Sequence, residues 1–303
     1  MSINRVSRSQ FLRIALLAST GVLSTGLSAG PRNDMLVSTA WLQSRLNDPS
    51  LALLHIAHDR AGYQSGHIPG ACFVPFTELA ITRDGVSNEL PPAAALVKLF
   101  EQCGVSDNSR IVLYGDNTLL SATRAYFTLD YLGHGGHAAL LDGGFEKWRA
   151  EKRPVSTEEP APRQGRLSPR LRPEVVVKLD QMRDLSWTAV NVPSSNVVIL
   201  DARAESSYKL AGPNTGHIPG AVNVFWSEAL TSKEVPGMKP RAEVERTYKQ
   251  AGTPGRGRTV VAYCNSGVQA THAYFTLKYL GYDDVRLYDG SFSEWTRAKA
   301  PVQ

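Results

Sequence analysis

The chain has 303 residues, of which 42% are hydrophobic, and it carries a formal net charge of +5. This length and composition are typical of a globular protein with room for two domains. The basic residues are dispersed and form no dense block interleaved with aromatic residues, which argues against a dedicated nucleic-acid surface. This mild excess of positive charge suits small anionic substrates, although ordinary solvated surface charge explains the excess equally simply.

The first thirty residues differ from the rest of the chain. Three arginines precede an apolar run over residues 14–27, and small residues follow it. This order is typical of a cleavable export signal, so we expect residues 1–30 to direct the chain to the periplasm. Ser9 stands where a twin-arginine signal has its second arginine, which disfavours that route. A disordered terminus or a membrane anchor is the alternative. No later apolar run reaches transmembrane length, so we expect no stable membrane insertion of the mature chain.

Strand and helix signals alternate from Met35 onward. In the first half we expect a short helix from Ser38, strands over 51–56, 72–76, 111–114 and 138–142, helices over 92–103 and 122–132, a Gly-His-Ile-Pro-Gly-Ala turn at 66–71, and a polar loop around Asp84-Gly85. The second half repeats these signals, with strands over 197–201 and 260–263, the same turn at 216–221, and helices over 241–252 and 270–280. Alternation of this kind predicts an α/β fold with mainly parallel sheets covered by helices on both faces.

A duplication organises the chain. Residues 273–277 repeat residues 125–129 letter for letter, and a repeat this long indicates a duplicated domain rather than a solenoid unit. Between the copies, residues 151–174 carry five prolines among charged residues, which is typical of a semi-rigid linker. We therefore expect one domain over 35–150 and a second over 175–303.

Cys264 lies between a predicted strand and a predicted helix. Ligands of open parallel sheets bind outside the carboxyl ends of the strands, which is where Cys264 falls. The N–H groups of a tight loop and the positive end of the next helix favour an anion there. We therefore expect its thiol to lose its proton more easily than a free cysteine does, and to act as a nucleophile. The alternative is a small buried hydrophobic residue.

The other two cysteines lack such a setting. Cys72 falls in a strand-like run, Cys103 falls at a helix end, and the first copy has Gly115 where the second has Cys264. The sequence has no Cys-x-x-Cys pair and no Cys/His cluster with zinc spacing. We therefore expect Cys72 and Cys103 to be packing residues, with no disulfide framework, no metal and no other cofactor.

These features together resemble the tandem-domain rhodanese-type sulfurtransferases, which use thiosulfate or 3-mercaptopyruvate. The resemblance covers residues 35–302 and rests on the two Gly-His-Ile-Pro-Gly-Ala turns, residues 200–203, the Cys264 loop and residues 289–295. It implies two rhodanese-like domains, of which only the second is catalytic. It also implies a double displacement in which Cys264 takes sulfur from a small anionic donor and passes it to a thiol or cyanide-like acceptor.

The resemblance implies roles for further residues. Six loop residues would hold the anionic sulfur with their N–H groups. They are Asn265, Ser266, Gly267, Val268, Gln269 and Ala270. Arg203 matches an arginine that contacts the donor, with a surface salt bridge as the alternative. His67 and Asp59 are candidates for the histidine and aspartate that mercaptopyruvate-type enzymes use with the loop serine. A structural hydrogen bond is the simpler role for His67 and for its twin, His217.

The donor stays open between two compounds. The neutral residues 265–268 are closer to the mercaptopyruvate pattern, whereas export favours thiosulfate, and on balance we expect thiosulfate. A phosphatase or arsenate reductase is disfavoured because Ala270 occupies the arginine position of a Cys-x5-Arg loop. A non-catalytic persulfide carrier is a further alternative, and the retained Arg203 argues against it. The sequence gives neither the sulfur acceptor nor the oligomeric state.

Overall fold

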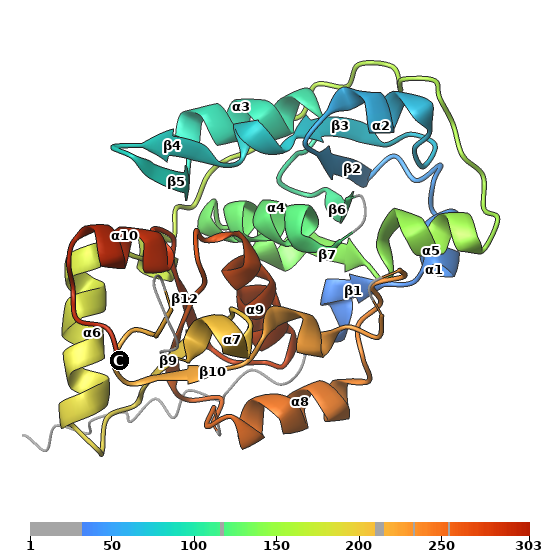
Figure 1. Cartoon of the computed structure of the whole chain (residues 1–303). Helices are drawn as coiled ribbons and strands as arrows, with labels where there is room; N and C mark the ends of the chain where they lie inside the picture. Colours follow the sequence, from blue (N-terminus) through green and yellow to red (C-terminus); the bar gives the residue numbers. More distant parts are fainter. Residues whose placement is uncertain (1–31, 116–117, 210–214, 233, 254) are drawn as a thin grey trace, which may run out of the picture.

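The computed structural model describes residues 32–115, 118–209, 215–232, 234–253 and 255–303. It contains two five-stranded parallel sheets, one in each half of the chain, and a separate antiparallel hairpin (Figure 1). The predicted export signal at residues 1–30 lies outside the described residues. The α/β prediction with two sheet-bearing halves is confirmed.

The first sheet has the strand order β1-β7-β6-β2-β3, and every neighbouring pair is parallel. Its strands are β1 (Leu36–Val37), β2 (Leu51–Ala57), β3 (Cys72–Pro75), β6 (Arg110–Gly115) and β7 (Ala138–Leu141). All seven residues of β2 are buried, as expected for a strand covered on both faces. The helices of this half are α1 (Thr39–Gln43), α2 (Arg60–Ser65), α3 (Ala93–Gln102), α4 (Leu120–Tyr131) and α5 (Gly144–Ala150).

The second sheet has the order β10-β9-β11-β12-β8 and is also parallel throughout. Its strands are β8 (Val176–Val177), β9 (Val197–Asp201), β10 (Ala221–Asn223), β11 (Thr259–Tyr263) and β12 (Asp284–Tyr288). The helices are α6 (Leu179–Asn191), α7 (Glu205–Tyr208), α8 (Arg241–Gln250), α9 (Val268–Tyr279) and α10 (Ser291–Arg297). The pivotal strand β11 lies between β9 and β12, so Cys264 follows a central strand of the sheet.

Each sheet has an outer and an inner face. Leu42 of α1 and Trp148 of α5 pack on the outer face of the first sheet, and Met182 of α6 and Trp295 of α10 pack on that of the second. The inner faces, covered by α3, α4, α8 and α9, share one continuous hydrophobic core. The two halves therefore meet through their inner helices, and α4 lies beside α9 in Figure 1.

The repeated Ala-Tyr-Phe-Thr-Leu segments form this junction. The ring of Tyr126 meets Phe275 edge-on at 5.0 Å, and the ring of Phe127 meets Tyr274 in the same way at 5.1 Å. The tyrosine of each copy thus contacts the phenylalanine of the other, as in an isologous interface.

Residues 84–85 were expected to belong to a polar loop. They form the turn of a hairpin between β4 (Ile81–Arg83) and β5 (Val86–Glu89). Asp84 and Gly85 both have positive φ angles, 51° and 77°, which a two-residue hairpin turn requires and which Asp-Gly adopts readily. The turn at Asp84-Gly85 is thus present, and the loop prediction was wrong for the two strands that flank it.

The first two cysteines also differ from expectation. Cys72 and Cys103 form a disulfide with their Cα atoms 5.5 Å apart, so the prediction that both are only packing residues was wrong. The bond joins the start of β3 to the residue after α3. A spacing of 31 residues carries no signal for this pairing, because adjacency arises only when the helix returns along the sheet.

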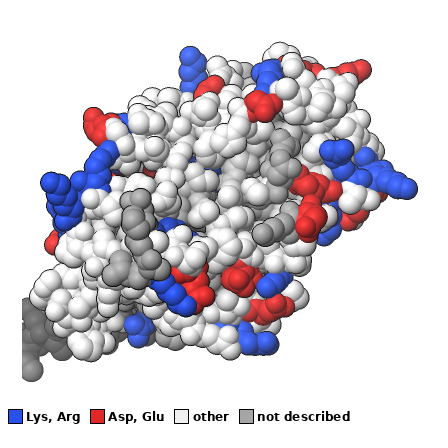
Figure 2. All heavy atoms as spheres, in the orientation of Figure 1, with Lys and Arg blue, Asp and Glu red and all other residues white. Residues whose placement is uncertain are grey.

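The stretch between the two sheets runs along the first domain. Within residues 151–172 the structure has two isolated bridges, from Ser156 to His67 and from Arg163 to Cys103. On the face drawn in Figure 2, Lys and Arg are scattered among Asp and Glu and gather into no single basic patch. Among the described residues, no helix is long and apolar enough to cross a membrane, and no group of three or more His, Cys, Asp or Glu side chains could hold a metal ion.

Candidate active site

Cys264 directly follows β11, and α9 begins four residues later. Gly267, with a φ of 88°, caps the helix and turns the chain tightly around the sulfur. Four backbone N–H groups of the loop, those of Ser266, Gly267, Gln269 and Ala270, act on the Cys264 sulfur and lower the pKa of its thiol. The predicted strand, loop and helix are thus present, with the amides turned toward the thiol. Among the described residues Cys264 is the free cysteine.

The charge state of the thiol differs from expectation. The side chain is 2% exposed, and this burial raises the pKa of the Cys264 thiol, while the four N–H groups act in the opposite direction. Burial is the larger effect, because a thiolate sealed from water loses its hydration. The prediction of a thiol that ionises more easily than a free cysteine was therefore wrong for this closed loop.

The start of α10 fixes the other side of the loop. The N–H of Phe292 donates to the Cys264 carbonyl oxygen at 3.0 Å, and the N–H of Ser293 donates to the Asn265 carbonyl oxygen at 3.0 Å. The Ser291 hydroxyl accepts the Cys264 N–H at 3.2 Å. With its backbone held in this way, the loop presents its remaining N–H groups to the sulfur without having to reorganise.

Two cavities adjoin the loop. One, of about 240 Å³, is lined by Asp59, Thr118 and Val268 among others. The second, of about 500 Å³, is lined by Thr118, Gln269 and Lys239, together with aromatic side chains that precede and begin a short 3-10 helix. Both cavities combine residues of the first domain with residues of the Cys264 loop. The site is therefore shared between the domains.

Arg203 is buried in a network of its own. Its Nε donates to Asp201 Oδ1 at 3.0 Å, and its Nη2 donates to Asp201 Oδ2 and to the Gly216 carbonyl oxygen, both at 2.6 Å. The guanidinium lies 3.9 Å from the centre of the Phe292 ring. These contacts indicate that Arg203 has a structural role beside the Cys264 loop. Contact of Arg203 with an anionic donor stays a prediction.

A family model for the rhodanese-like domain matches the chain twice, over residues 38–151 and 184–298. The chain belongs to the rhodanese-like domain family. Each match covers four of the five strands of one sheet, so the internal repeat is a repeat of the rhodanese-like domain.

Curated relatives extend over most of this rhodanese-like chain. A protein of Thermus thermophilus named "Sulfur carrier protein TtuD" is 32% identical over 86% of this chain and 93% of its own. A "Thiosulfate sulfurtransferase" of Corynebacterium glutamicum is 31% identical over 89% of this chain and 90% of its own. Among solved structures, SseA from Escherichia coli, described as a 3-mercaptopyruvate sulfotransferase, has a TM-score of 0.72 at 25% identity and covers 85% of this chain and 98% of its own.

The Gly-His-Ile-Pro-Gly-Ala turns of both rhodanese-like domains use their histidines alike. His67 Nδ1 lies 2.8 Å from the Tyr63 carbonyl oxygen, and its ring stacks on Tyr63 at 3.8 Å. His217 Nδ1 lies 3.0 Å from the Tyr208 carbonyl oxygen and stacks on Tyr208 at 3.9 Å. His67 Nε2 contacts the Glu158 carbonyl oxygen at 3.1 Å. The structure thus places both histidines in structural bonds of their turns.

Asp59 and Ser266 lie in different settings. The Asp59 carboxylate accepts the Gly62 N–H at 3.0 Å as the cap of α2, and it lines the smaller cavity. The Ser266 Oγ lies 3.2 Å from Asn88 Nδ2. Among the described residues, no hydrogen bond joins His67 or Asp59 to Ser266. A group of these three side chains is not assembled in this structure.

Two residues of the first domain that sequence reasoning missed approach the loop. Asn88 of β5 contacts Ser266, and Arg124 of α4 forms a buried ion pair with Asp289 at 2.6 Å. The signal that could have found Asn88 is Asp84-Gly85, a dipeptide typical of hairpin turns. No pattern in the sequence marked Arg124, because it lies on a helix that is buried on nearly all sides.

Proposed function

We propose that this chain is a sulfurtransferase that carries sulfur as a persulfide on Cys264. The observation that carries the proposal is the convergence of four loop N–H groups on one buried, free sulfur atom. Such groups stabilise a sulfur anion before, during and after transfer. The similarity to the thiosulfate sulfurtransferase of Corynebacterium glutamicum supports the same reaction class.

The reaction has two balanced steps. In the first, the Cys264 thiol gives its proton to solvent and the resulting thiolate attacks the outer sulfur of the donor. A sulfur–sulfur bond forms, and the donor's own bond to that sulfur breaks. With thiosulfate, sulfite leaves with the electron pair. In the second, an acceptor such as cyanide attacks the outer persulfide sulfur, and the Cys264 thiolate leaves with the electron pair of the broken bond. Splitting transfer in this way predicts ping-pong kinetics.

We propose thiosulfate as the donor. Its transfer to a thiolate needs no proton, because sulfite departs as an anion. Mercaptopyruvate must instead move its thiol proton to the carbon that becomes the methyl group of pyruvate. The described partner of the Ser266 hydroxyl is the Asn88 amide, which does not act as an acid or a base near neutral pH. A site without a titratable partner for Ser266 is better suited to thiosulfate.

A persulfide carrier is the second candidate. The similarity to the Thermus thermophilus sulfur carrier protein favours it. In that case Cys264 would accept sulfur from a small anionic donor or a protein and pass it to a partner thiol, with no steady turnover of small molecules. The cavity beside Gln269, at about 500 Å³, favours small reactants. We therefore retain catalysis as the primary function.

We also propose that the protein is exported to the periplasm. The basic, apolar and small order of residues 1–30 supports export. The Cys72–Cys103 disulfide supports an oxidising compartment, because such bonds persist outside the reducing cytosol.

The test is a steady-state comparison of thiosulfate with 3-mercaptopyruvate, with cyanide as acceptor. We expect turnover with thiosulfate to exceed turnover with mercaptopyruvate, Cys264→Ala to abolish both, and intact mass after donor treatment to show one added sulfur on the Cys264 peptide. The Cys72→Ala/Cys103→Ala variant is the matched control and should transfer sulfur nearly normally. Uptake of one sulfur without turnover would support the carrier, and sulfur on Cys72 or Cys103 would overturn the assignment.

A further inference from the structure

The β4–β5 hairpin of the first domain reaches the Cys264 loop of the second. Asn88 Nδ2 donates to the Ser266 carbonyl oxygen at 2.9 Å, across 178 residues of sequence. Asn88 has a φ of 62°, in the left-handed region, which asparagine adopts more readily than most residues. The backbone conformation of β5 thus turns this one side chain toward the loop.

This contact controls the direction of one amide. The Ser266 carbonyl and the Gly267 N–H belong to the same planar trans peptide, so they point in opposite directions. The Gly267 N–H is one of the four groups that lower the pKa of the Cys264 thiol and so favour its anion. A hydrogen bond that holds the Ser266 oxygen toward Asn88 therefore keeps the Gly267 N–H directed at the sulfur.

A buried ion pair holds the hairpin and the loop together. Arg124 is fully buried, and its Nη1 lies 2.6 Å from Asp289 Oδ1, while its Nη2 donates to the Asn88 carbonyl oxygen at 2.6 Å. Gly267 fits tightly against Asp289, because a Cβ at Gly267 would lie 2.7 Å from the Asp289 carbonyl oxygen. Asn88 thus bonds the Ser266 carbonyl oxygen, and Asp289 packs closely against Gly267.

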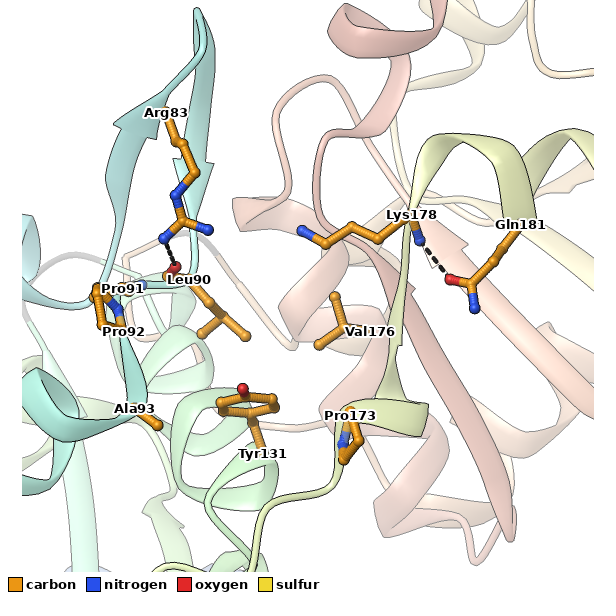
Figure 3. A pocket seen from close by; sticks show the side chains of 10 residues that line it. All are labelled: Arg83, Leu90, Pro91, Pro92, Ala93, Tyr131, Pro173, Val176, Lys178 and Gln181. Carbon is orange, nitrogen blue, oxygen red and sulfur yellow. Dashed lines mark hydrogen bonds between the residues drawn. The ribbon is translucent and has the colours of Figure 1, made fainter.

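The hairpin is also tied to the start of the second domain. Lys178 Nζ lies 2.8 Å from Glu89 Oε2, one residue after Asn88. Figure 3 shows Lys178 extending toward the hairpin strand that carries Arg83, across a cavity of about 400 Å³. Arg83 donates to the Leu90 carbonyl oxygen at 2.9 Å. The base of the hairpin is therefore fixed on both sides of the domain boundary.

We propose that Asn88 is a positioning residue, through which the thiol-free first domain orients the Gly267 amide that stabilises the Cys264 thiolate and persulfide. The inference rests on the proposed function for its effect on transfer. Its effect on the thiol itself does not require any sulfur donor. The first domain is then part of the active site rather than an inert copy.

The test compares Asn88→Gly and Asn88→Asp with the unaltered protein. Glycine accepts the positive φ without strain, and aspartate keeps the shape but has no N–H to donate. Both leave Arg124 and Asp289, the paired charged groups beside the loop, in place. We expect the pH midpoint of Cys264 alkylation to rise in both variants and the rate of sulfur loading from thiosulfate to fall about tenfold.

A matched control and a second loop variant complete the test. Asn191→Ala removes an exposed asparagine whose amide donates to the Trp187 carbonyl oxygen within α6, and it should leave the midpoint and the loading rate unchanged. Ser266→Ala removes the hydroxyl but keeps the carbonyl, so it should shift the midpoint less than Asn88→Gly does. The proposal that Asn88 acts by binding the Ser266 carbonyl would be overturned by an equal midpoint shift in Ser266→Ala. An unchanged midpoint in both Asn88 variants would overturn it as well. A failure of the unaltered protein to take up sulfur would instead count against the proposed function.

Discussion

Cys264 is subject to two opposing influences. Its side chain is almost sealed from water, which raises the pKa of the thiol, and four N–H groups are directed at its sulfur, which favours the anion. Since burial is the larger effect, the pKa of the thiol lies above its ordinary value. The same amides remain available to the persulfide once sulfur has been taken up. The loop is thus better arranged to keep a sulfur anion than to create one unaided.

This balance predicts a strong pH dependence of the free thiol. Because the pKa of Cys264 is raised, the thiolate fraction should grow about tenfold per pH unit and should still be rising at about pH 9. The measurement is the rate of alkylation by iodoacetamide, with Cys72 and Cys103 held in their disulfide. A small free thiol treated in parallel should level off earlier. A plateau for Cys264 already reached near neutral pH would contradict the prediction.

At the level of single residues, the sequence predicted those whose role follows from local order. Cys264 and its loop were predicted from a strand, a glycine and a helix in succession, and the structure places them so. The contact of Asn88 with Ser266 could not be predicted, because it depends on how two domains dock. The direction of the pKa shift was also missed, since burial is set by packing and not by sequence neighbours.

Helix α9 shows how an element can serve the site and the core together. It begins at the Cys264 loop, and its residues from Ala270 to Leu277 are all buried. Among them is His272, whose Nδ1 lies 3.5 Å from Thr276 Oγ1 and whose ring meets Trp226 edge-on at 5.3 Å. Burial lowers the pKa of His272 to about 4. The helix therefore carries a neutral imidazole in its packed interior.

His272 should make the protein sensitive to acid. As the pH is lowered, His272 takes up a proton near its ordinary pKa of about 6.5 in the unfolded chain but only near pH 4 in the folded chain. The free energy of unfolding therefore decreases as the pH is lowered from about 6.5 to about 4. When the pH is lowered from about 7.5 to about 4.5, the His272→Gln variant should lose about 2–3 kcal/mol less free energy of unfolding than the unaltered protein does, as measured by urea titration. The exposed His137→Gln is the control. Equal losses in the unaltered protein and in His272→Gln would refute the prediction.

At the level of elements, helical spacing and β-branched runs predicted most strands and helices to within a few residues. The hairpin was missed because its strands are short and carry polar side chains, so no alternating pattern announces them. In the sequence, only the turn dipeptide Asp84-Gly85 indicates the hairpin. The missed hairpin is also the element that carries Asn88, so an error in local structure concealed part of the site.

The whole molecule is two rhodanese-like domains on one continuous core. The letter-for-letter repeat predicted the duplication, and the repeated tyrosines and phenylalanines of α4 and α9 contact one another reciprocally. The orientation of the domains could not be derived from the sequence, because it depends on buried pairs such as Arg124 with Asp289. Neither could the disulfide, whose partners become neighbours only after the first domain has folded.

The disulfide gives a prediction for the molecule as a whole. Closing a loop across 31 residues restricts the unfolded chain, which corresponds to about 3–4 kcal/mol of stability. The Cys72→Ser/Cys103→Ser variant should therefore lose about this amount of unfolding free energy in urea titration, without a comparable loss of sulfur transfer where it stays folded. Variants are preferable to reducing agents, because reductants also remove the persulfide from Cys264.

If export is correct, protein recovered from the periplasm should expose a single alkylatable thiol after unfolding, because Cys72 and Cys103 are already oxidised there. Three alkylatable thiols in that fraction would contradict both the disulfide and the oxidising destination inferred from it.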